Sequence, residues 1–288
     1  MPPKAKGLRR LDRFSAIVTL LGLLVPAVLG AIALEVAHQA VPALQEFGLG
    51  FLWGQDWNPN RDVYGALPHV WGTLVTSAIA LGLAGPAGLG TAILLTEDWP
   101  WLPKGLQEAL AIAVELLAAV PSVVCGLWSL LVLIPFLQGW TPVRGPGLLA
   151  AGITLAIAVV PLTAALSREA LAAVSPALRE GALALGASRW QTLGRVILPA
   201  ALPGLTGAIA LALGRALGET MAVAMTIGNG LRISLDWGAP ASSIAALLAN
   251  QFAEADGLQI AALMYLALVL FGLTALVNLL ANLLRRSP

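Results

Sequence analysis

Three ionisable side chains lie inside long apolar stretches of this sequence. Glu115 occurs in VELLAAVPSVVCG, and Arg215 and Glu219 occur four residues apart in LGRALGETMAV. An ionisable group inside a membrane-spanning stretch costs free energy, so its presence is by default a hypothesis for a functional site. A spacing of four predicts that Arg215 and Glu219 share one helix face within pairing distance. These three residues are therefore candidates for a polar path through apolar segments.

Local sequence around these residues adds detail. Pro121 follows Glu115 and predicts a helix break, which would leave backbone carbonyl groups free near the carboxylate. Alternatively, Glu115 bonds to a neighbouring helix or extends to a membrane interface. Gly214 and Gly218 are also four apart, and this spacing predicts close approach of another helix beside Arg215 and Glu219.

The sequence gives no support for nucleotide binding by a P-loop, metal binding or cysteine redox chemistry. A P-loop needs a lysine after its glycines, and the only lysines are residues 4, 6 and 104, so ATP binding by such a loop is excluded. His38 and His69 are isolated, and no cluster has metal-ligand spacing. Cys125 is the single cysteine and is interpreted as a packing residue. We expect no catalytic residue, metal or cofactor in this chain.

Residues 175–199 are polar although apolar segments flank them on both sides. Ser175 followed by proline predicts a helix start, and Gly186 predicts a left-handed helix end. Ser188 with Gln191 is a capping-box pattern that predicts a second helix. Apolar residues give this helix pair a surface for docking, and charged residues keep it out of the bilayer. The apolar set is Leu178, Leu185, Trp190, Leu193 and Val196, and the charged set is Arg179, Glu180, Arg189 and Arg195.

This segment resembles the "EAA" loop of ATP-binding-cassette importer permeases. The family pattern is Glu-Ala-Ala, a Gly six residues after the Glu, and then Ile-x-Leu-Pro. The matching residues are Glu180, Ala182, Gly186, Val196, Leu198 and Pro199, with Gly181 and Val196 as the departures. The resemblance implies that 175–199 are cytoplasmic coupling helices, where Glu180, Gly186, Arg189, Leu198 and Pro199 would contact a separate ATPase. The alternative is a generic interfacial helix pair.

Composition requires a membrane environment for the rest of the chain. Hydrophobic residues make up 58 % of the sequence and charged residues 11 %, which is typical of polytopic membrane proteins. We expect an all-α fold, residues 1–288 forming a single domain with six transmembrane helices. The predicted spans are 14–35, 70–95, 107–138, 147–167, 200–227 and 258–284, with external loops at 36–68 and 228–257. The third span is interrupted by Pro121 and Pro135 and is counted as one net crossing.

Positive charge predicts the orientation of these spans. With both termini cytoplasmic, 12 Lys and Arg residues lie inside, three lie outside and Arg215 lies within a span. The inside set is Lys4, Lys6, Arg9, Arg10, Arg13, Lys104, Arg168, Arg179, Arg189, Arg195, Arg285 and Arg286. A cleaved signal peptide is the competing interpretation of the first span, but an apolar core of 21 residues is longer than the usual 7 to 15. A net charge of +1 gives no reason to expect nucleic-acid binding.

A second resemblance covers most of residues 48–229. The stretches FLWGQDWNPNRDVYGALPHVWGTLVTS, ELLAAVPSVVCGLWSLLVL and LGRALGETMAVAMTIGN are similar to segments of the PstC-type permeases of phosphate-specific (Pst) importers. The resemblance implies the MetI-like fold of type I importer permeases in the bacterial inner membrane, with Arg215 and Glu219 acting in translocation. The implied partners are a PstA-type permease, a PstB-type ATPase dimer, an external phosphate-binding protein and membrane lipid.

Two other functions are weighed against this one. An ion-coupled secondary transporter could use Glu115, Arg215 and Glu219 as a relay, but such a protein has no need of a cytoplasmic corner with this spacing. An importer permease for another oxyanion or small solute would share the coupling segment, so substrate identity depends on the second resemblance.

Overall fold

The protein is described here by a computed structural model, which covers residues 13–141 and 143–286. These residues form helices and turns without a named strand. The basic residues predicted at the N-terminus before Arg13 lie outside the described residues. The elements are α1 (Arg13–Phe47), η1 (Gly48–Leu52), η2 (Pro59–Arg61), α2 (Leu67–Thr96), α3 (Lys104–Ala119), α4 (Ser122–Trp128), η3 (Ser129–Leu133), α5 (Ile134–Trp140), α6 (Leu148–Ala172), α7 (Pro176–Ala184), α8 (Arg189–Thr192), η4 (Leu193–Ile197), α9 (Leu198–Gly218), α10 (Met221–Thr226), α11 (Ile244–Gln251) and α12 (Gly257–Arg286).

Six stretches of the described chain are helical, long and apolar enough to cross a membrane. They are Ser15–Leu52, Leu67–Thr96, Ser122–Trp140, Leu148–Ala172, Arg189–Gly218 and Gly257–Leu280. The predicted all-α membrane fold with six spans is confirmed for this part of the chain. The span boundaries differ in detail from the predicted ones, and the differences have physical causes.

Helix α1 continues to Phe47, so the loop predicted from residue 36 begins with three more turns of helix. The polar residues of this stretch favoured a loop, but Ala40 and Ala43, three residues apart on one helix face, are both buried. They lie in an apolar cluster with Tyr265 of α12, whose ring stacks on Phe51 at 4.4 Å between ring centroids. Burial against α12 therefore stabilises the extra turns.

The second predicted loop, 228–257, also contains a helix, α11. The hydroxyl oxygen of Ser243 accepts a hydrogen bond from the backbone N–H of Ala246 at 3.2 Å and so caps this helix. Tight bonds hold the preceding segment, with the N–H of Ala241 donating to Ile227 at 2.9 Å. This loop is therefore an ordered layer of the molecule.

The third span is broken, as predicted. Helix α3 ends at Ala119, Val120 is extended, and α4 begins after Pro121. Residues Ser129–Leu133 then form a π-helical turn, η3, before α5. A second π-helical turn, η4, joins α8 to α9. Such turns hold one residue more than an α-helical turn and recur at functional sites.

Helices α2 and α6 form the centre of the fold. A Cβ atom on Gly88 would lie 2.7 Å from the side chain of Thr163, and one on Gly152 would lie 2.6 Å from Ile79. Glycine at both positions therefore lets the two helices pack closely. Helix α6 is the most enclosed span, with 61 % of its apolar window buried.

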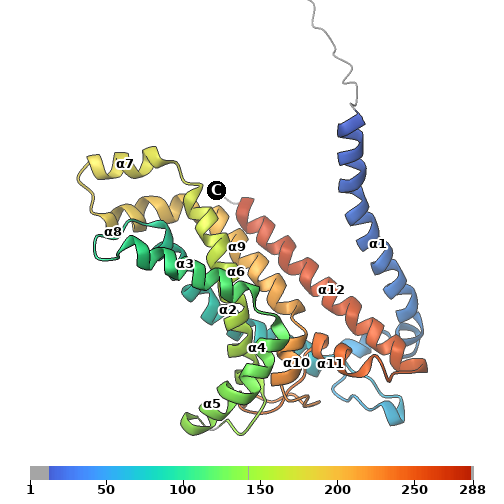
Figure 1. Cartoon of the computed structure of the whole chain (residues 1–288). Coiled ribbons are helices and arrows are strands. Elements are labelled where there is room, and N and C mark those ends of the chain that lie inside the picture. The colour runs from blue at the N-terminus through green and yellow to red at the C-terminus, as the bar shows by residue number, and fades with distance from the viewer. Residues whose placement is uncertain (1–12, 142, 287–288) are drawn as a thin grey trace, which may run out of the picture.

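The chain has two distinct ends in Figure 1. Helices α7 and α8 and the C-terminal end of α12 lie at one end, and α5, α10, α11 and the segment after α1 lie at the other. Helix α1 meets α12 near the second end and diverges from it toward the first. We call the end that carries α7 and α8 the coupling end and the opposite one the loop end.

Candidate functional site

The coupling segment, residues 175–199, forms the predicted helix pair. Helix α7 ends at Ala184, Leu185 is its C-cap residue, and Gly186 follows with a φ of +86°. The N–H of Gly186 donates to Leu183 at 2.9 Å and that of Ala187 to Ala182 at 3.1 Å, which satisfies the last carbonyls of α7. These bonds and the positive φ confirm the left-handed corner.

Helix α8 begins with the predicted capping box. The hydroxyl oxygen of Ser188 accepts a bond from the N–H of Gln191, and the Gln191 side chain accepts one from the N–H of Ser188 at 2.8 Å. Both bonds satisfy donors that a helix start otherwise leaves free. The orientation of α8 relative to α7 is therefore specified by local sequence.

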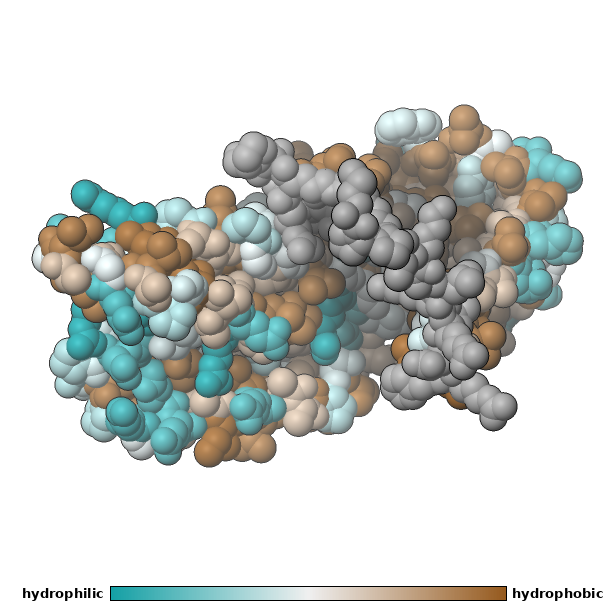
Figure 2. Space-filling view, turned by 90° about the horizontal axis from the view of Figure 1, so that it is seen from above, coloured by the Kyte–Doolittle hydropathy of each residue, from teal (hydrophilic) through white to brown (hydrophobic). Residues whose placement is uncertain are grey.

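The outer face of the coupling segment is partly apolar. Leu178, Leu183 and Trp190 are exposed, and Leu185 is 91 % exposed. Figure 2, which looks onto the coupling end, shows polar and apolar side chains intermixed there. Large apolar side chains among charged ones are typical of a surface that another protein covers.

One residue predicted for this outer surface lies elsewhere. Leu193 is only 4 % exposed and packs in an apolar cluster with Ala92 of α2, Leu171 of α6 and Ile197. It occupies the π-helical turn η4, where the chain turns inward toward α9. Its predicted docking role is therefore wrong, because its side chain belongs to the interior.

The five residues predicted from the EAA pattern to contact the ATPase differ in solvent exposure. Glu180, Gly186, Arg189 and Pro199 are exposed, whereas Leu198 is half-buried and packs against the cluster that contains Leu193. The guanidinium of Arg189 donates to the backbone carbonyl of Asp98, in the turn between α2 and α3. Part of this set thus contacts the chain itself.

Arg215 and Glu219 do not share a helix face. Helix α9 ends at Gly218, and Glu219 adopts an extended conformation with φ −69° and ψ 122° before α10 starts at Met221. The predicted pairing at a spacing of four is wrong, because it requires a continuous helix. No ion pair joins the two side chains in the described structure. The predicted continuous span over 200–227 is interrupted at the same place.

In the described part of the chain, no helix covers the face of α9 around Arg215. Arg215 is exposed, Leu211 is 56 % exposed, and a Cβ atom added to Gly214 or Gly218 would meet nothing within 4 Å. The close helix approach predicted from these glycines is therefore not made by any residue that the structure describes. The surface is left free for solvent, lipid or another subunit.

The two interrupted spans pack on each other beyond their breaks. A Cβ atom on Gly126 of α4 would lie 3.1 Å from the Cα of Ala222 and 3.0 Å from the sulfur of Met225, both in α10. Glu219 lies three residues before Ala222. Helix α4 thus contacts α10 close in sequence to Glu219.

Glu115 is exposed on α3, a helix without a buried residue. Among the described residues it forms no ion pair with Arg215 and no bond to Glu219. The structure thus brings α4 and α10 together but does not gather the three predicted residues into one cluster.

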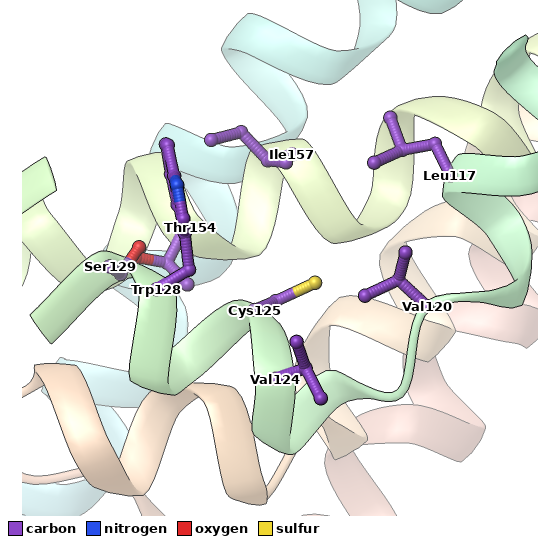
Figure 3. A pocket seen from close by; sticks show the side chains of 8 residues that line it. All are labelled: Leu117, Val120, Val124, Cys125, Trp128, Ser129, Thr154 and Ile157. Atoms are coloured by element: carbon purple, nitrogen blue, oxygen red, sulfur yellow. The ribbon is translucent and has the colours of Figure 1, made fainter. Parts of the chain in front are cut away.

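An apolar pocket of about 290 Å³ lies between α3, α4 and α6 (Figure 3). Its lining residues are Leu117, Val120, Val124, Cys125, Trp128, Ser129, Thr154 and Ile157. The hydroxyls of Ser129 and Thr154 bond to each other at 2.5 Å, so their polarity is satisfied. The pocket offers no charge to an ionic solute, and the described residues contain no metal-binding cluster.

A polar cleft at the loop end is a feature that the sequence did not predict. It has a volume of about 350 Å³, and its lining includes Arg61 from the first loop and Arg232 from the second. Neither arginine has an ion-pair partner in the described residues. The sequence shows one arginine in each predicted loop, but it does not indicate that the two arginines lie close together.

Comparison with known proteins identifies the family. Residues 100–286 match the family described as "Binding-protein-dependent transport system inner membrane component". The chain belongs to this family. The matched region contains the coupling segment, both helix breaks and all three ionisable candidates. As a member, the chain is a multi-span inner-membrane component of a transporter whose ATPase and substrate-binding protein are separate subunits.

Three relatives are similar over nearly the whole chain. Phosphate transport system permease protein PstC of Pasteurella multocida is 39 % identical over 96 % of this chain and 90 % of its own length. The protein of the same name from Haemophilus influenzae is 39 % identical over 94 % and 91 %. A probable PstC of Methanocaldococcus jannaschii is 33 % identical over 87 % and 85 %.

Solved structures support the fold. A chain of the inward-facing MetNI methionine ABC transporter aligns with a TM-score of 0.61 and 22 % identity, over 76 % of this chain and 93 % of its own. A chain of a bacterial alginate ABC transporter aligns with a TM-score of 0.64 and 17 % identity, over 96 % and 97 %. The predicted MetI-like type I permease fold is thereby confirmed. Membership of this binding-protein-dependent family also rules out the ion-coupled secondary transporter.

Proposed function

We propose that this chain is the PstC-type permease subunit of an ATP-driven importer of inorganic phosphate. The observation that carries the proposal is 39 % identity, over more than nine-tenths of the chain, to proteins named phosphate transport system permease PstC in several bacteria. The substrate would arrive on an external binding protein and pass between this subunit and a second, PstA-type permease. ATP would be hydrolysed by a PstB-type ATPase dimer.

Arg215 is the residue best suited to meet the anion. A guanidinium presents a planar fork of donors that fits two phosphate oxygens at once. Arg215 is exposed on the open face of α9 and has no acidic partner among the described residues, so its donors are available to an anion. Glu219 lies at the helix break, four residues after Arg215. Its negative charge would repel the anion and so shorten the time that the anion stays bound. Glu115 would contribute to the pathway from α3.

The coupling segment would receive the ATPase. Its charges for this contact are Glu180 and Arg189, and its corner is Gly186. Its connection to α9 is formed by Leu198 and Pro199. The exposed side chains of Leu185 and its neighbours supply apolar area that a protein groove would bury. An ATPase bound here would displace α6 and α9 directly, since both are continuous with the coupling segment.

Orientation gives a prediction that is independent of substrate. A reporter placed within 228–257 should be labelled from outside, and one within 168–200 should be labelled only after permeabilisation, because 12 Lys and Arg residues then lie inside against three outside. Both termini would be cytoplasmic. Labelling of single-cysteine variants in a Cys125→Ser background, in intact cells, measures this. The reverse pattern would refute the proposed orientation.

Substrate identity is tested by reconstitution. The chain would be purified with its permease partner and ATPase in proteoliposomes, and ATP hydrolysis measured with binding protein loaded with phosphate, sulfate or molybdate. We expect phosphate to stimulate hydrolysis and to accumulate inside, and the other two anions to do neither. Stimulation by sulfate or molybdate instead would assign the permease to another oxyanion.

A further inference from the structure

The turn between α2 and α3 makes several specific contacts with the coupling segment. Two arginines and an indole ring of the coupling segment contact three consecutive residues of this turn. We call this set the clasp. It consists of Glu97, Asp98 and Trp99 in the turn with Arg179, Arg189 and Trp190 in the coupling segment.

An ion pair forms the first side of the clasp. Arg179 of α7 donates from Nη1 to the Oε2 of Glu97 at 2.6 Å, and the two side chains are only 30 % and 17 % exposed. This is the one ion pair among residues 13–141 and 143–286. Its partial burial reduces screening by salt, so the charges hold each other more firmly than an exposed pair does.

The second side of the clasp involves α8. Arg189 donates to the Asp98 carbonyl, and the rings of Trp190 and Trp99 lie 4.8 Å apart between centroids at 43°. Glu97 Oε1, Trp99 Nε1 and Thr192 Oγ1 are buried at this interface without a hydrogen-bond partner. Unpaired buried polar atoms destabilise an interface. Specific contacts thus hold the clasp in place, but three buried polar atoms at this interface remain free to form hydrogen bonds in another conformation of the transporter.

The turn itself is joined firmly to the two helices it connects. The side-chain amide of Gln107, in the first turn of α3, donates to the carbonyls of Leu94 at 2.9 Å and Glu97 at 3.2 Å. A displacement of Glu97 would therefore move the end of α2 and the start of α3 together.

Connectivity indicates what the clasp does. Helices α6 and α9 are covalently continuous with the coupling segment, but α2 and α3 are not. Beneath the clasp, Ala92 of α2 packs with Leu171 and Leu193, but apolar contact is non-directional and permits sliding. The ion pair and the Arg189 bond fix the register between the turn and the coupling segment.

We propose that the clasp transmits movement of the coupling segment to α2 and α3. Helix α3 leads through the break at Pro121 into α4. Gly126 of α4 packs on Ala222 of α10, which lies three residues beyond Glu219. The clasp thus connects the ATPase side to the broken region of both interrupted spans. This inference rests on the proposed function of the coupling segment as the ATPase dock.

The test measures coupling efficiency in the complete reconstituted transporter. Glu97→Gln and Arg179→Gln each remove one charge of the pair and keep the side-chain size. We expect at least a fivefold fall in phosphate transported per ATP hydrolysed, with the ATPase still co-purifying at the wild-type ratio. The exchange of Glu97→Arg with Arg179→Glu should restore most of the ratio. Glu108→Gln, an exposed carboxylate without a partner on α3, is the matched control and should change nothing.

A crosslink gives a second measurement that does not depend on charge. Trp99→Cys with Trp190→Cys, in a Cys125→Ser background, removes the ring contact and should lower the transport ratio. A short bifunctional thiol reagent should restore it, and cleaving the reagent should abolish the gain.

The outcomes separate this inference from the function on which it rests. An unchanged ratio in Glu97→Gln and Arg179→Gln, or no recovery on crosslinking, would refute transmission through the clasp. Loss of the ATPase from the clasp variants would show a role in assembly and would equally refute it. A wild-type complex without phosphate-stimulated hydrolysis would instead refute the proposed function.

Discussion

Replacing Arg215 with lysine should reduce phosphate uptake about 10- to 100-fold while the transporter still assembles. Arg215→Lys keeps the positive charge on the open face of α9 but removes the bidentate fork. Hydrogen bonds to charged groups contribute about 1.5 to 3 kcal/mol, and about 1.4 kcal/mol corresponds to a factor of ten. Uptake of labelled phosphate by proteoliposomes measures the loss. Arg144→Lys, an exposed arginine at the loop end, is the matched control.

The break after Gly218 sharpens this test. No ion pair joins Arg215 to Glu219 in the described structure, so exchanging the two residues restores no interaction. The exchange only removes the guanidinium from α9. We expect Arg215→Glu with Glu219→Arg to insert normally and to transport no better than Arg215→Ala. Wild-type uptake in the exchanged protein, or uptake within twofold of wild type in Arg215→Lys, would contradict the pathway role.

Valine at position 186 should detach the ATPase. Gly186 has a φ of +86°, in the left-handed region that a β-branched residue strongly avoids. An added Cβ would meet no atom within 4 Å, so the effect acts through the backbone and not through a clash. A left-handed conformation costs about 1 to 2 kcal/mol for an ordinary residue, so the corner between α7 and α8 would open. We expect the amount of ATPase that co-purifies to fall about 5- to 30-fold, since about 1.4 kcal/mol is a factor of ten.

Two substitutions distinguish the corner from a general loss of stability. Gly186→Asn should retain an intermediate amount of ATPase, because asparagine tolerates the left-handed conformation. Gly181→Ala changes a helical glycine of α7 with open space around it and introduces the residue usual in the EAA pattern. It should bind the ATPase normally. Full binding by Gly186→Val, with transport intact, would show that this corner does not position the dock.

Strong local signals made the spans and the corner predictable. Apolar runs of 18 residues or more have few alternatives to a membrane helix, and Gly186 with Ser188 specifies the corner through capping alone. The end of α9 was different: LGRALGET contains no proline, and Gly218, where the helix ends, was interpreted as a packing glycine. The spacing argument for Arg215 and Glu219 assumed a continuous helix and could not detect this boundary.

Long-range polar contacts were equally hidden. The partners in the clasp ion pair, Glu97 and Arg179, are separated by 82 positions, and nothing in either local sequence indicates the other. The same holds for Arg61 and Arg232 in the cleft at the loop end. Sequence pattern predicts which segments are helical and which surface is polar, but the pairing of charges far apart in sequence depends on how turns meet.

The π-helical turns η3 and η4 make the chain tolerant of length changes at two defined places. Each holds one residue beyond what an α-helical turn needs, so deleting one residue from Ser129–Leu133 or Leu193–Ile197 would leave a regular helix instead of a gap. The helices on either side would keep their relative orientation, because the wider turn accommodates the additional residue without adding a rotation of about 100°, as an insertion into a regular α-helix would. Homologues that lack one residue in 193–197 would thus present the same face of α8 to the cytoplasm from the same α9.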